Sequence, residues 1–222
     1  MLVIGYLTDL RRSNVKKIIF IKSKNQIFID MGNGDKFFPT EYLTIDNYEK
    51  IRGRQSFAFW LVGNSGSGKS TLAKSVEKML YDTNYAVKCL DGDNLRSTLN
   101  SDLDLTINSR TEHIRRCAEV SKMFLENGIS TINCFISPTE EMRNYAKKIL
   151  GNKFLLIYIK ASDEEVKKRD VKKLYKSDAE NMNKSLNMFE IPSNPDLIID
   201  TTGKTIEYSA NILFNFIINQ PL

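Results

Sequence analysis

The segment between Gly63 and Thr71 combines glycines, a lysine and hydroxyl side chains at a spacing that can bind phosphate. It follows the pattern G-x-x-x-x-G-K-[ST] through Gly63, Asn64, Ser65, Gly66, Ser67, Gly68, Lys69 and Ser70, and Thr71 comes next. Glycines let backbone amides face a polyphosphate, a lysine reaches its β and γ groups, and a serine hydroxyl can bind Mg²⁺. We predict that these residues bind ATP, with Lys69 as a catalytic cation and Ser70 as a magnesium ligand. The loop alone does not separate a kinase from a GTPase or a motor.

A second group of chemically active residues follows an apolar run that ends in the sequence Asp91-Gly92-Asp93-Asn94-Leu95-Arg96. If that run is a parallel strand, both carboxylates and the guanidinium lie at the carboxyl edge of the sheet, where α/β proteins bind ligands. A carboxylate there can hold Mg²⁺ through water or accept the proton of an attacking hydroxyl. Arg96 can bind an acidic group of the phosphate acceptor. The alternative interpretation is a surface turn with an ion pair.

Residues 56–222 alternate apolar runs of strand length with stretches of helical period. This pattern predicts an α/β fold of the P-loop NTPase type, with a parallel five-stranded sheet flanked by helices. Strands are expected within residues 56–63, 85–91, 129–136, 153–160 and 195–201. Helices are expected at about 69–81, 110–127, after Pro138, 162–169 and 205–218. The polar stretch at about 170–190 is long for a connection, and we interpret it as a lid.

Residues 1–55 have a different pattern, in which short alternating runs, VKKIIFIK and NQIFIDM, are separated by Ser-Lys-Asn. They predict a small β-hairpin extension. The extension carries no recognisable chemistry. We expect it to serve packing or dimerisation, with a contribution to acceptor recognition as the alternative.

The composition is that of an ordinary globular protein, with 41% hydrophobic and 27% charged residues. A net charge of +5 is spread over lysine pairs that are typical of solvated helix faces, and it can attract nucleotides. No basic stripe interleaved with aromatics indicates nucleic-acid binding. Cys89, Cys117 and Cys134 lack the spacing of a disulfide framework or a zinc site. No signal peptide or membrane span is recognised, so a cytoplasmic location is expected.

Six blocks between Phe57 and Thr202 resemble the adenylyl-sulfate (APS) kinase family, in the family's order and at nearly its spacing. They are GNSGSGKST, DGDNLRSTLN, SRTEHIRRCAEVSKMFLENGI, CFISP, RDVKKLYK and NPDLIIDT. The resemblance implies a P-loop α/β kinase, usually a homodimer, that uses MgATP to phosphorylate the ribose 3′-hydroxyl of adenylyl sulfate. The product is PAPS, the activated form of sulfate.

The resemblance also implies roles for individual residues. Asp91 would be the catalytic base or the acid that organises magnesium, and Arg169 and Thr202 would lie near the ATP base. Ser137 matches a serine that is described in the family as a phosphorylated intermediate, although direct in-line transfer needs no covalent step. The implied acceptor contacts are Asp93, Asn94, Arg96, Arg110, His113, Ile136, Ser137, Lys172 and Leu186.

Three departures from the family pattern bear on the acceptor. His113, near what we expect to be an exposed helix start, replaces an asparagine, and Thr139-Glu140-Glu141-Met142-Arg143 replaces an arginine-rich stretch. The acidic pair in that stretch is expected to weaken the attraction of an anionic acceptor. The family's lid element Phe-Thr-Gly-Ile-Asp is missing, and Leu186 is the nearest match to its stacking phenylalanine. Losing an aromatic platform removes about 1–3 kcal/mol of base stacking, enough to change which base is preferred.

Two alternatives to the APS kinase interpretation therefore stay open. One is a related kinase that phosphorylates another nucleotide conjugate, such as a cytidine diphosphate derivative in capsule or polysaccharide biosynthesis. The other is a catalytically silent nucleotide-binding module, against which the intact Lys69, Ser70, Asp91 and Arg110 argue.

Overall fold

The computed structural model of the 222-residue chain describes residues 43–169 and 189–221, together with the backbones of four short strands nearer the N-terminus. It divides the chain into two compact units, Met1–Leu43 and Thr44–Leu222. Lys172, Leu186 and nearly all of the segment interpreted as a lid lie outside the described residues.

In the first unit the structure describes four strands, whose backbones pair in antiparallel fashion in the order β1-β2-β3-β4. Between β2 and β3, Ile19 lies opposite Asp30 and Ser23 opposite Gln26. The role and extent of an N-terminal extension stay predictions. The strands are β1 (Val3–Tyr6), β2 (Ile19–Ser23), β3 (Gln26–Asp30) and β4 (Lys36–Phe37).

The second unit is built on a parallel five-stranded sheet of order β6-β7-β5-β8-β9, which confirms the predicted fold class. Every residue of the central strand is buried, as the apolar sequence Ala-Phe-Trp-Leu-Val requires of a strand covered on both faces. The strands are β5 (Ala58–Val62), β6 (Val87–Asp91), β7 (Ser130–Cys134), β8 (Phe154–Lys160) and β9 (Leu197–Asp200).

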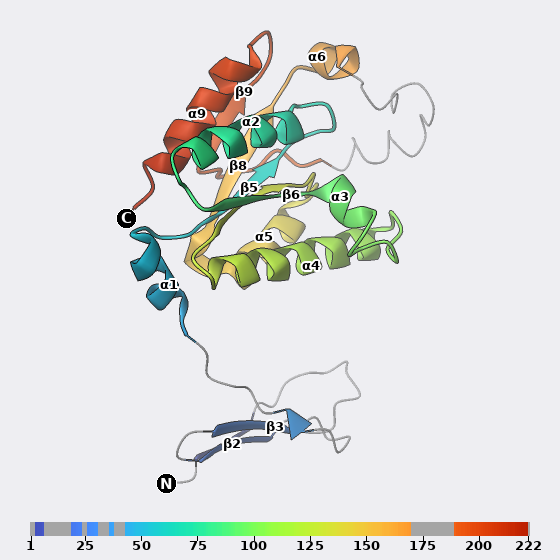
Figure 1. Cartoon of the computed structure of the whole chain (residues 1–222). Coiled ribbons are helices and arrows are strands. Elements are labelled where there is room, and N and C mark those ends of the chain that lie inside the picture. The colour runs from blue at the N-terminus through green and yellow to red at the C-terminus, as the bar shows by residue number, and fades with distance from the viewer. Residues whose placement is uncertain are drawn as a thin grey trace. The chain divides into compact units, whose positions relative to one another are not determined.

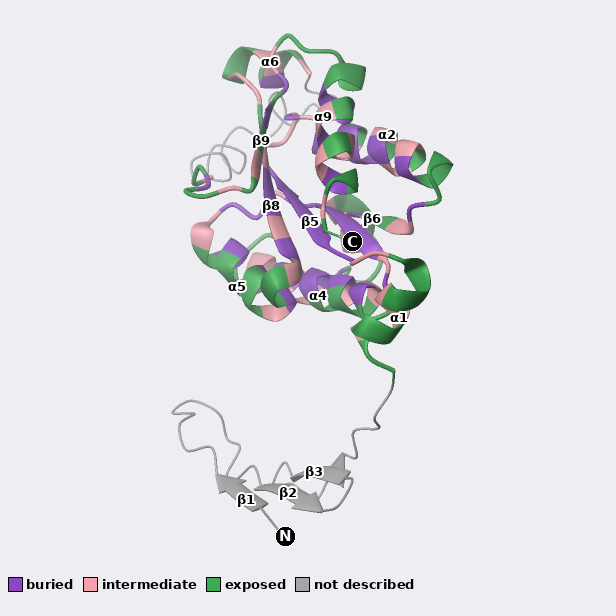
Figure 2. Cartoon of the chain, turned by 90° about the vertical axis from the view of Figure 1, so that its left-hand side faces the viewer, coloured by how far each residue is buried: buried purple, intermediate pink, exposed green. Residues whose placement is uncertain are grey.

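Helices cover both faces of this sheet (Figures 1 and 2). Helices α2 (Lys69–Asp82) and α9 (Ile206–Ile218) pack on one face, and α4 (Ile107–Leu125) and α5 (Glu140–Leu150) on the other. Side chains of β5 alternate between the two layers: Phe59 and Leu61 join the cluster with α2 and α9, and Ala58, Trp60 and Val62 join the cluster with α4 and α5.

Three shorter α-helices lie in the described part of this unit: α1 (Ile45–Arg52), α3 (Gly92–Arg96) and α6 (Asp163–Lys168). Helix α1, which the sequence analysis did not predict, is attached to the sheet by Glu49. Its carboxylate accepts hydrogen bonds from the amide of Ser56 at 2.6 Å and from Lys153 Nζ at 2.9 Å.

The three cysteines are free thiols. Over the residues that the structure describes, no helix is both long and apolar enough to cross a membrane.

Candidate functional site

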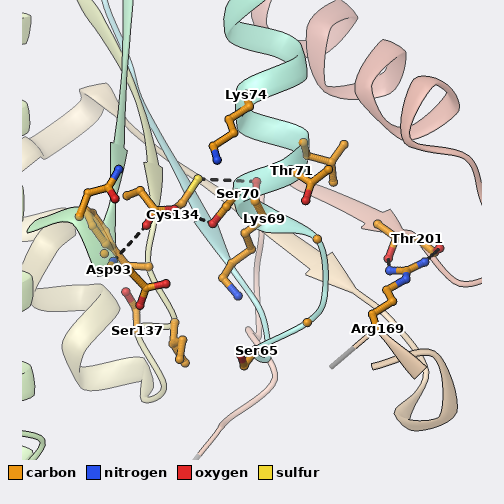
Figure 3. A pocket seen from close by; sticks show the side chains of 18 of the residues that line it. Ser65, Lys69, Ser70, Thr71, Lys74, Asp93, Cys134, Ser137, Arg169 and Thr201 are labelled. Carbon is orange, nitrogen blue, oxygen red and sulfur yellow. Dashed lines mark hydrogen bonds between the residues drawn. The ribbon is translucent and has the colours of Figure 1, made fainter. Parts of the chain in front are cut away.

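A pocket of about 930 Å³ lies where β5, β6 and β7 end, and it brings most of the predicted site residues together. Figure 3 shows Lys69, Ser70 and Thr71 at the start of α2, with Asp93 and Ser137 on one side of the pocket and Arg169 and Thr201 on the other. Predicted residues that line it are Ser65, Gly66, Gly68, Lys69, Ser70, Thr71, Asp91, Asp93, Asn94, Arg96, Arg110, His113, Ile136, Ser137 and Arg169. Gly63, Asn64, Ser67 and Thr202 do not line it.

The loop from Gly63 to Gly68 has a backbone that requires glycine. Gly63 and Gly68 have φ angles of 151° and 100°, which side chains disfavour. A Cβ atom on Gly63 would also lie 2.3 Å from the carbonyl oxygen of Ile159. Lys69 Nζ donates to the carbonyl oxygens of Gly63 at 2.7 Å and of Asn64 at 2.8 Å. The loop therefore curls around the lysine ammonium group.

Ser70 and Asp91 meet beside this loop, because α2 begins next to the end of β6. The Ser70 hydroxyl donates to Asp91 Oδ2 at 2.5 Å, and Asp91 Oδ1 caps α3 by accepting from the Asp93 amide at 3.0 Å. Within the described ranges, no group of three or more His, Cys, Asp or Glu side chains is arranged to hold a metal ion. One hydroxyl and one carboxylate nevertheless fit Mg²⁺, which takes few protein oxygens and completes its shell with phosphate and water.

Arg169 is fixed to the phosphate loop through Thr201. Its Nη1 donates to Thr201 Oγ1 at 3.0 Å and its Nη2 to the Thr201 carbonyl at 2.8 Å, while Thr201 Oγ1 donates to the Ser67 carbonyl at 3.1 Å. The neighbouring Thr202, which the resemblance places near the ATP base, accepts a hydrogen bond on its hydroxyl from the Ser162 amide at 2.9 Å. No signal in the Thr-Thr pair distinguishes the two residues.

Two guanidinium groups line the acceptor side of the pocket. Arg96 donates to the carbonyl of Asp104 at 3.2 Å, and Arg110 donates to the carbonyl of Leu105 at 2.8 Å. Burial lowers the pKa of both groups, and the charge of Arg96 adds to the effect on Arg110. Arginines remain charged under these conditions. The pair is thus a partly desolvated cationic surface suited to an anionic group.

His113 lies in this wall and is buried, so the expectation of an exposed helix start was wrong. Helix α4 begins at Ile107, capped by Thr106, instead of near Arg110, and His113 therefore falls in its second turn. Burial, followed by the charges of Arg96 and Arg110, lowers the pKa of the imidazole to about 4. The ring is neutral at pH 7.

Ser137 has an unusual backbone conformation for a residue with a side chain, with φ at 42°. It is 2% exposed, and its Oγ accepts from Trp60 Nε1 at 3.0 Å. Its carbonyl oxygen accepts from Arg143 Nη1 at 2.9 Å. The hydroxyl keeps its own hydrogen, which can be donated to a ligand.

Arg143, which the sequence analysis did not single out as a site residue, supports this loop from behind. It is 1% exposed, donates to the Pro138 carbonyl at 3.2 Å and pairs with Glu140 at 2.7 Å. Because Glu140 is neutralised in this way, it repels an anionic acceptor less than its charge suggested.

Phe189 stacks on Tyr158 with ring centroids 6.0 Å apart and does not line the pocket.

Known proteins are similar to this chain in sequence and in structure. The sequence model of the Adenylylsulphate kinase family matches residues 55–200. An adenylyl-sulfate kinase of Bacteroides thetaiotaomicron is 40% identical over 79% of this chain and 90% of its own length, and one of Clostridium acetobutylicum is 41% identical over 77% and 88%. The APS kinase of Mycobacterium tuberculosis, solved with AMPPNP and APS, is 30% identical, with a TM-score of 0.66 over 74% of this chain and 99% of that one. The chain belongs to the adenylylsulphate kinase family.

Proposed function

We propose that the protein is an ATP-dependent kinase that phosphorylates the 3′-hydroxyl of adenylyl sulfate and releases PAPS. The observation that carries the proposal is the continuity of one pocket from the phosphate loop at Lys69 to the guanidinium groups of Arg96 and Arg110. Family membership supports the same reaction, as does the likeness to a kinase solved with APS and an ATP analogue.

On the donor side, the amides of the glycine loop and the start of α2 hold the β- and γ-phosphates of ATP. Lys69 moves its hydrogen bonds from the carbonyls of Gly63 and Asn64 toward phosphate oxygens, which are stronger acceptors because they are charged. Ser70 and Asp91 would hold Mg²⁺, which neutralises charge on the transferring phosphoryl group when bound. The short contact between Ser70 and Asp91 supports the magnesium-organising role for Asp91 over that of a free base.

On the acceptor side, Arg96 and Arg110 bind the anionic mixed anhydride of adenylyl sulfate and turn its ribose toward the loop. Asp93, Asn94 and the hydroxyl of Ser137 supply hydrogen bonds to uncharged parts of the acceptor. All five residues line the pocket. Positioning and charge neutralisation suffice for direct phosphoryl transfer, so Ser137 acts as a binding residue and forms no phosphoenzyme.

The experiment is an assay of the purified chain with Mg-ATP and a panel of nucleotide conjugates, in which ADP and the phosphorylated acceptor are both measured. Turnover of adenylyl sulfate to PAPS supports the proposal. Turnover of only another conjugate, such as a cytidine diphosphate derivative, would show that this conjugate is the acceptor instead of adenylyl sulfate. ATP binding without any turnover would indicate a catalytically silent module.

Two broader properties are proposed on the family resemblance. We expect a homodimer, which light scattering coupled to size-exclusion chromatography would test; a monomer or a larger assembly would contradict it. We also expect the enzyme to work in the cytoplasm, where ATP is available, and fractionation of the source cells would test this.

A further inference from the structure

The surroundings of His113 determine which of its ring nitrogens carries a proton. Asn100 Nδ2 lies 2.8 Å from His113 Nδ1 and 3.7 Å from Cys117 Sγ, so the side-chain NH₂ group faces a ring nitrogen and a sulfur atom, while the buried Asn100 Oδ1 has no hydrogen-bond partner among the described residues. Asn100 is fully buried, and its backbone is fixed by bonds from its amide to the Leu95 carbonyl at 2.8 Å and from the Leu103 amide to its carbonyl at 3.1 Å. The side-chain amide of Asn100 is therefore held against the imidazole ring of His113.

The charges around the ring favour its neutral form. Arg96 of α3 and Arg110 of α4 both oppose a proton on His113, and Asp93 of α3 opposes them only in part. The ring also meets Phe135 edge to face, with centroids 5.6 Å apart and planes at 89°. A neutral imidazole that accepts at Nδ1 has to carry its hydrogen on Nε2.

The Nε2 atom of His113 lies beside Gly92. A Cβ atom built on Gly92, which lines the pocket, would lie 3.7 Å from His113 Nε2, and His113 itself lines the same pocket. Cys117 Sγ lies 3.7 Å from Nε2, and a sulfur atom is only a weak acceptor. An N–H group at Nε2 can therefore exchange this weak contact for a stronger hydrogen bond to a bound substrate.

We propose that Asn100 is a positioning residue that holds His113 as the Nε2–H tautomer, so that the acceptor side of the pocket presents an uncharged hydrogen-bond donor beside Arg96 and Arg110. The inference rests on the proposed function for the identity of the acceptor. In this arrangement, Arg96 and Arg110 alone recognise the negative charge of the acceptor nucleotide. His113 selects acceptors that offer a lone pair, such as a ribose or ring-nitrogen atom, at that point of the wall.

The tautomer can be measured directly because the chain contains one histidine. Long-range ¹H–¹⁵N correlation spectra of the protein, with any affinity tag removed, report both ring nitrogens of His113 without ambiguity. We expect a protonated Nε2 and an unprotonated Nδ1 at pH 7, and a shift of the Nε2 signal when adenylyl sulfate is added. A proton on Nδ1, which the reverse orientation of the Asn100 amide would produce, or a charged ring would overturn the proposal.

Variants of Asn100 then test the positioning role. Asn100→Ala should give a mixture of tautomers and raise KM for adenylyl sulfate about three- to tenfold, the value of one hydrogen bond, with KM for ATP changed less than about twofold. Asn133 provides a matched control, since it is also fully buried and hydrogen-bonded but contacts Ser121 and Thr131. Asn133→Ala should lower stability while leaving the tautomer and both KM values unchanged.

Asn100→Asp keeps the shape of the side chain if the alanine variant fails to fold. A carboxylate can only accept a hydrogen bond, so the ring proton of His113 should move from Nε2 to Nδ1. KM for adenylyl sulfate should rise in this variant as it does in Asn100→Ala. An unchanged tautomer in both Asn100 variants, or a changed tautomer with an unchanged KM, would refute the positioning role. If adenylyl sulfate is not a substrate, the spectra of the free protein still test the tautomer, so failure of the proposed function is seen separately.

Discussion

Replacing Arg143 by methionine should destabilise the protein more than the same replacement in an exposed ion pair of the same sequence spacing. Arg143 and Glu140 form an i, i+3 pair at 2.7 Å whose arginine side chain is 1% exposed. Removing one partner of a buried charge pair costs about 3–5 kcal/mol. Glu140 is 39% exposed and can be rehydrated, so we expect the lower value, about 3 kcal/mol.

The control is Arg115→Met. Arg115 and Glu112 form an i, i+3 pair at the same distance, 2.7 Å, but their side chains are 39% and 34% exposed, and Glu112 keeps Arg116 as a second partner. An exposed pair contributes less than about 1 kcal/mol. The two variants should therefore differ by about 2 kcal/mol in the free energy of unfolding, roughly 30-fold in the folding equilibrium.

Urea unfolding followed by circular dichroism measures both values, and kinetics of the folded variants test the connection to the site. Because Arg143 holds the carbonyls of Ser137 and Pro138, its loss should raise KM for the acceptor more than KM for ATP. Equal stabilities of the two variants would show that burial of Arg143 does not strengthen its contacts. Equal changes in both KM values would show that Arg143 does not position the acceptor wall.

Four further changes test other parts of the site. Lys69→Ala should abolish transfer, a loss of about 10³-fold or more in kcat, and full activity would refute the proposed phosphate site. Gly63→Ala should prevent ATP binding, measured by calorimetry, because the added methyl group would lie 2.3 Å from a carbonyl oxygen of β8; normal affinity would contradict this. The pKa of His113 is lowered from 6.5 to about 4, so the unfolded chain takes up its proton first as the pH falls. The free energy of unfolding should therefore drop by up to about 3 kcal/mol between pH 6.5 and pH 4, and the drop should be smaller in His113→Asn, with identical pH profiles as the refuting result. Leu186→Phe, in the segment outside the described residues, is predicted from the sequence to lower KM for adenylyl sulfate, and an unchanged or higher KM would count against the stacking argument.

The sheet and its phosphate loop could be predicted because local sequence and global fold agree there. The five apolar runs became the five strands, and the helix predicted at 69–81 is observed at Lys69–Asp82. Glycines with positive φ and a lysine at a fixed spacing leave few other structures for Gly63 to Ser70. Such features depend on residues that are neighbours in the chain.

Other features depend on contacts between distant residues, which the sequence does not display. The burial of His113 follows from where α4 begins, and the cap at Thr106 was not recognised. That Thr201 contacts Arg169 depends on the fold, because the two residues are 32 positions apart in the chain. Arg143 resembled any arginine on a charged helix until its position behind Ser137 was known.

The alternation of side chains along β5 restricts how this chain can change in evolution. Phe59 and Leu61 serve one helical layer, while Trp60 and Val62 serve the other. Inserting or deleting a single residue within this strand would send each of these side chains to the opposite layer. The end of β5 would then point toward the opposite face of the sheet, and the glycine loop that follows would start on that face. Length variants of the chain should therefore spare residues 58–68 and be found in the surface connections.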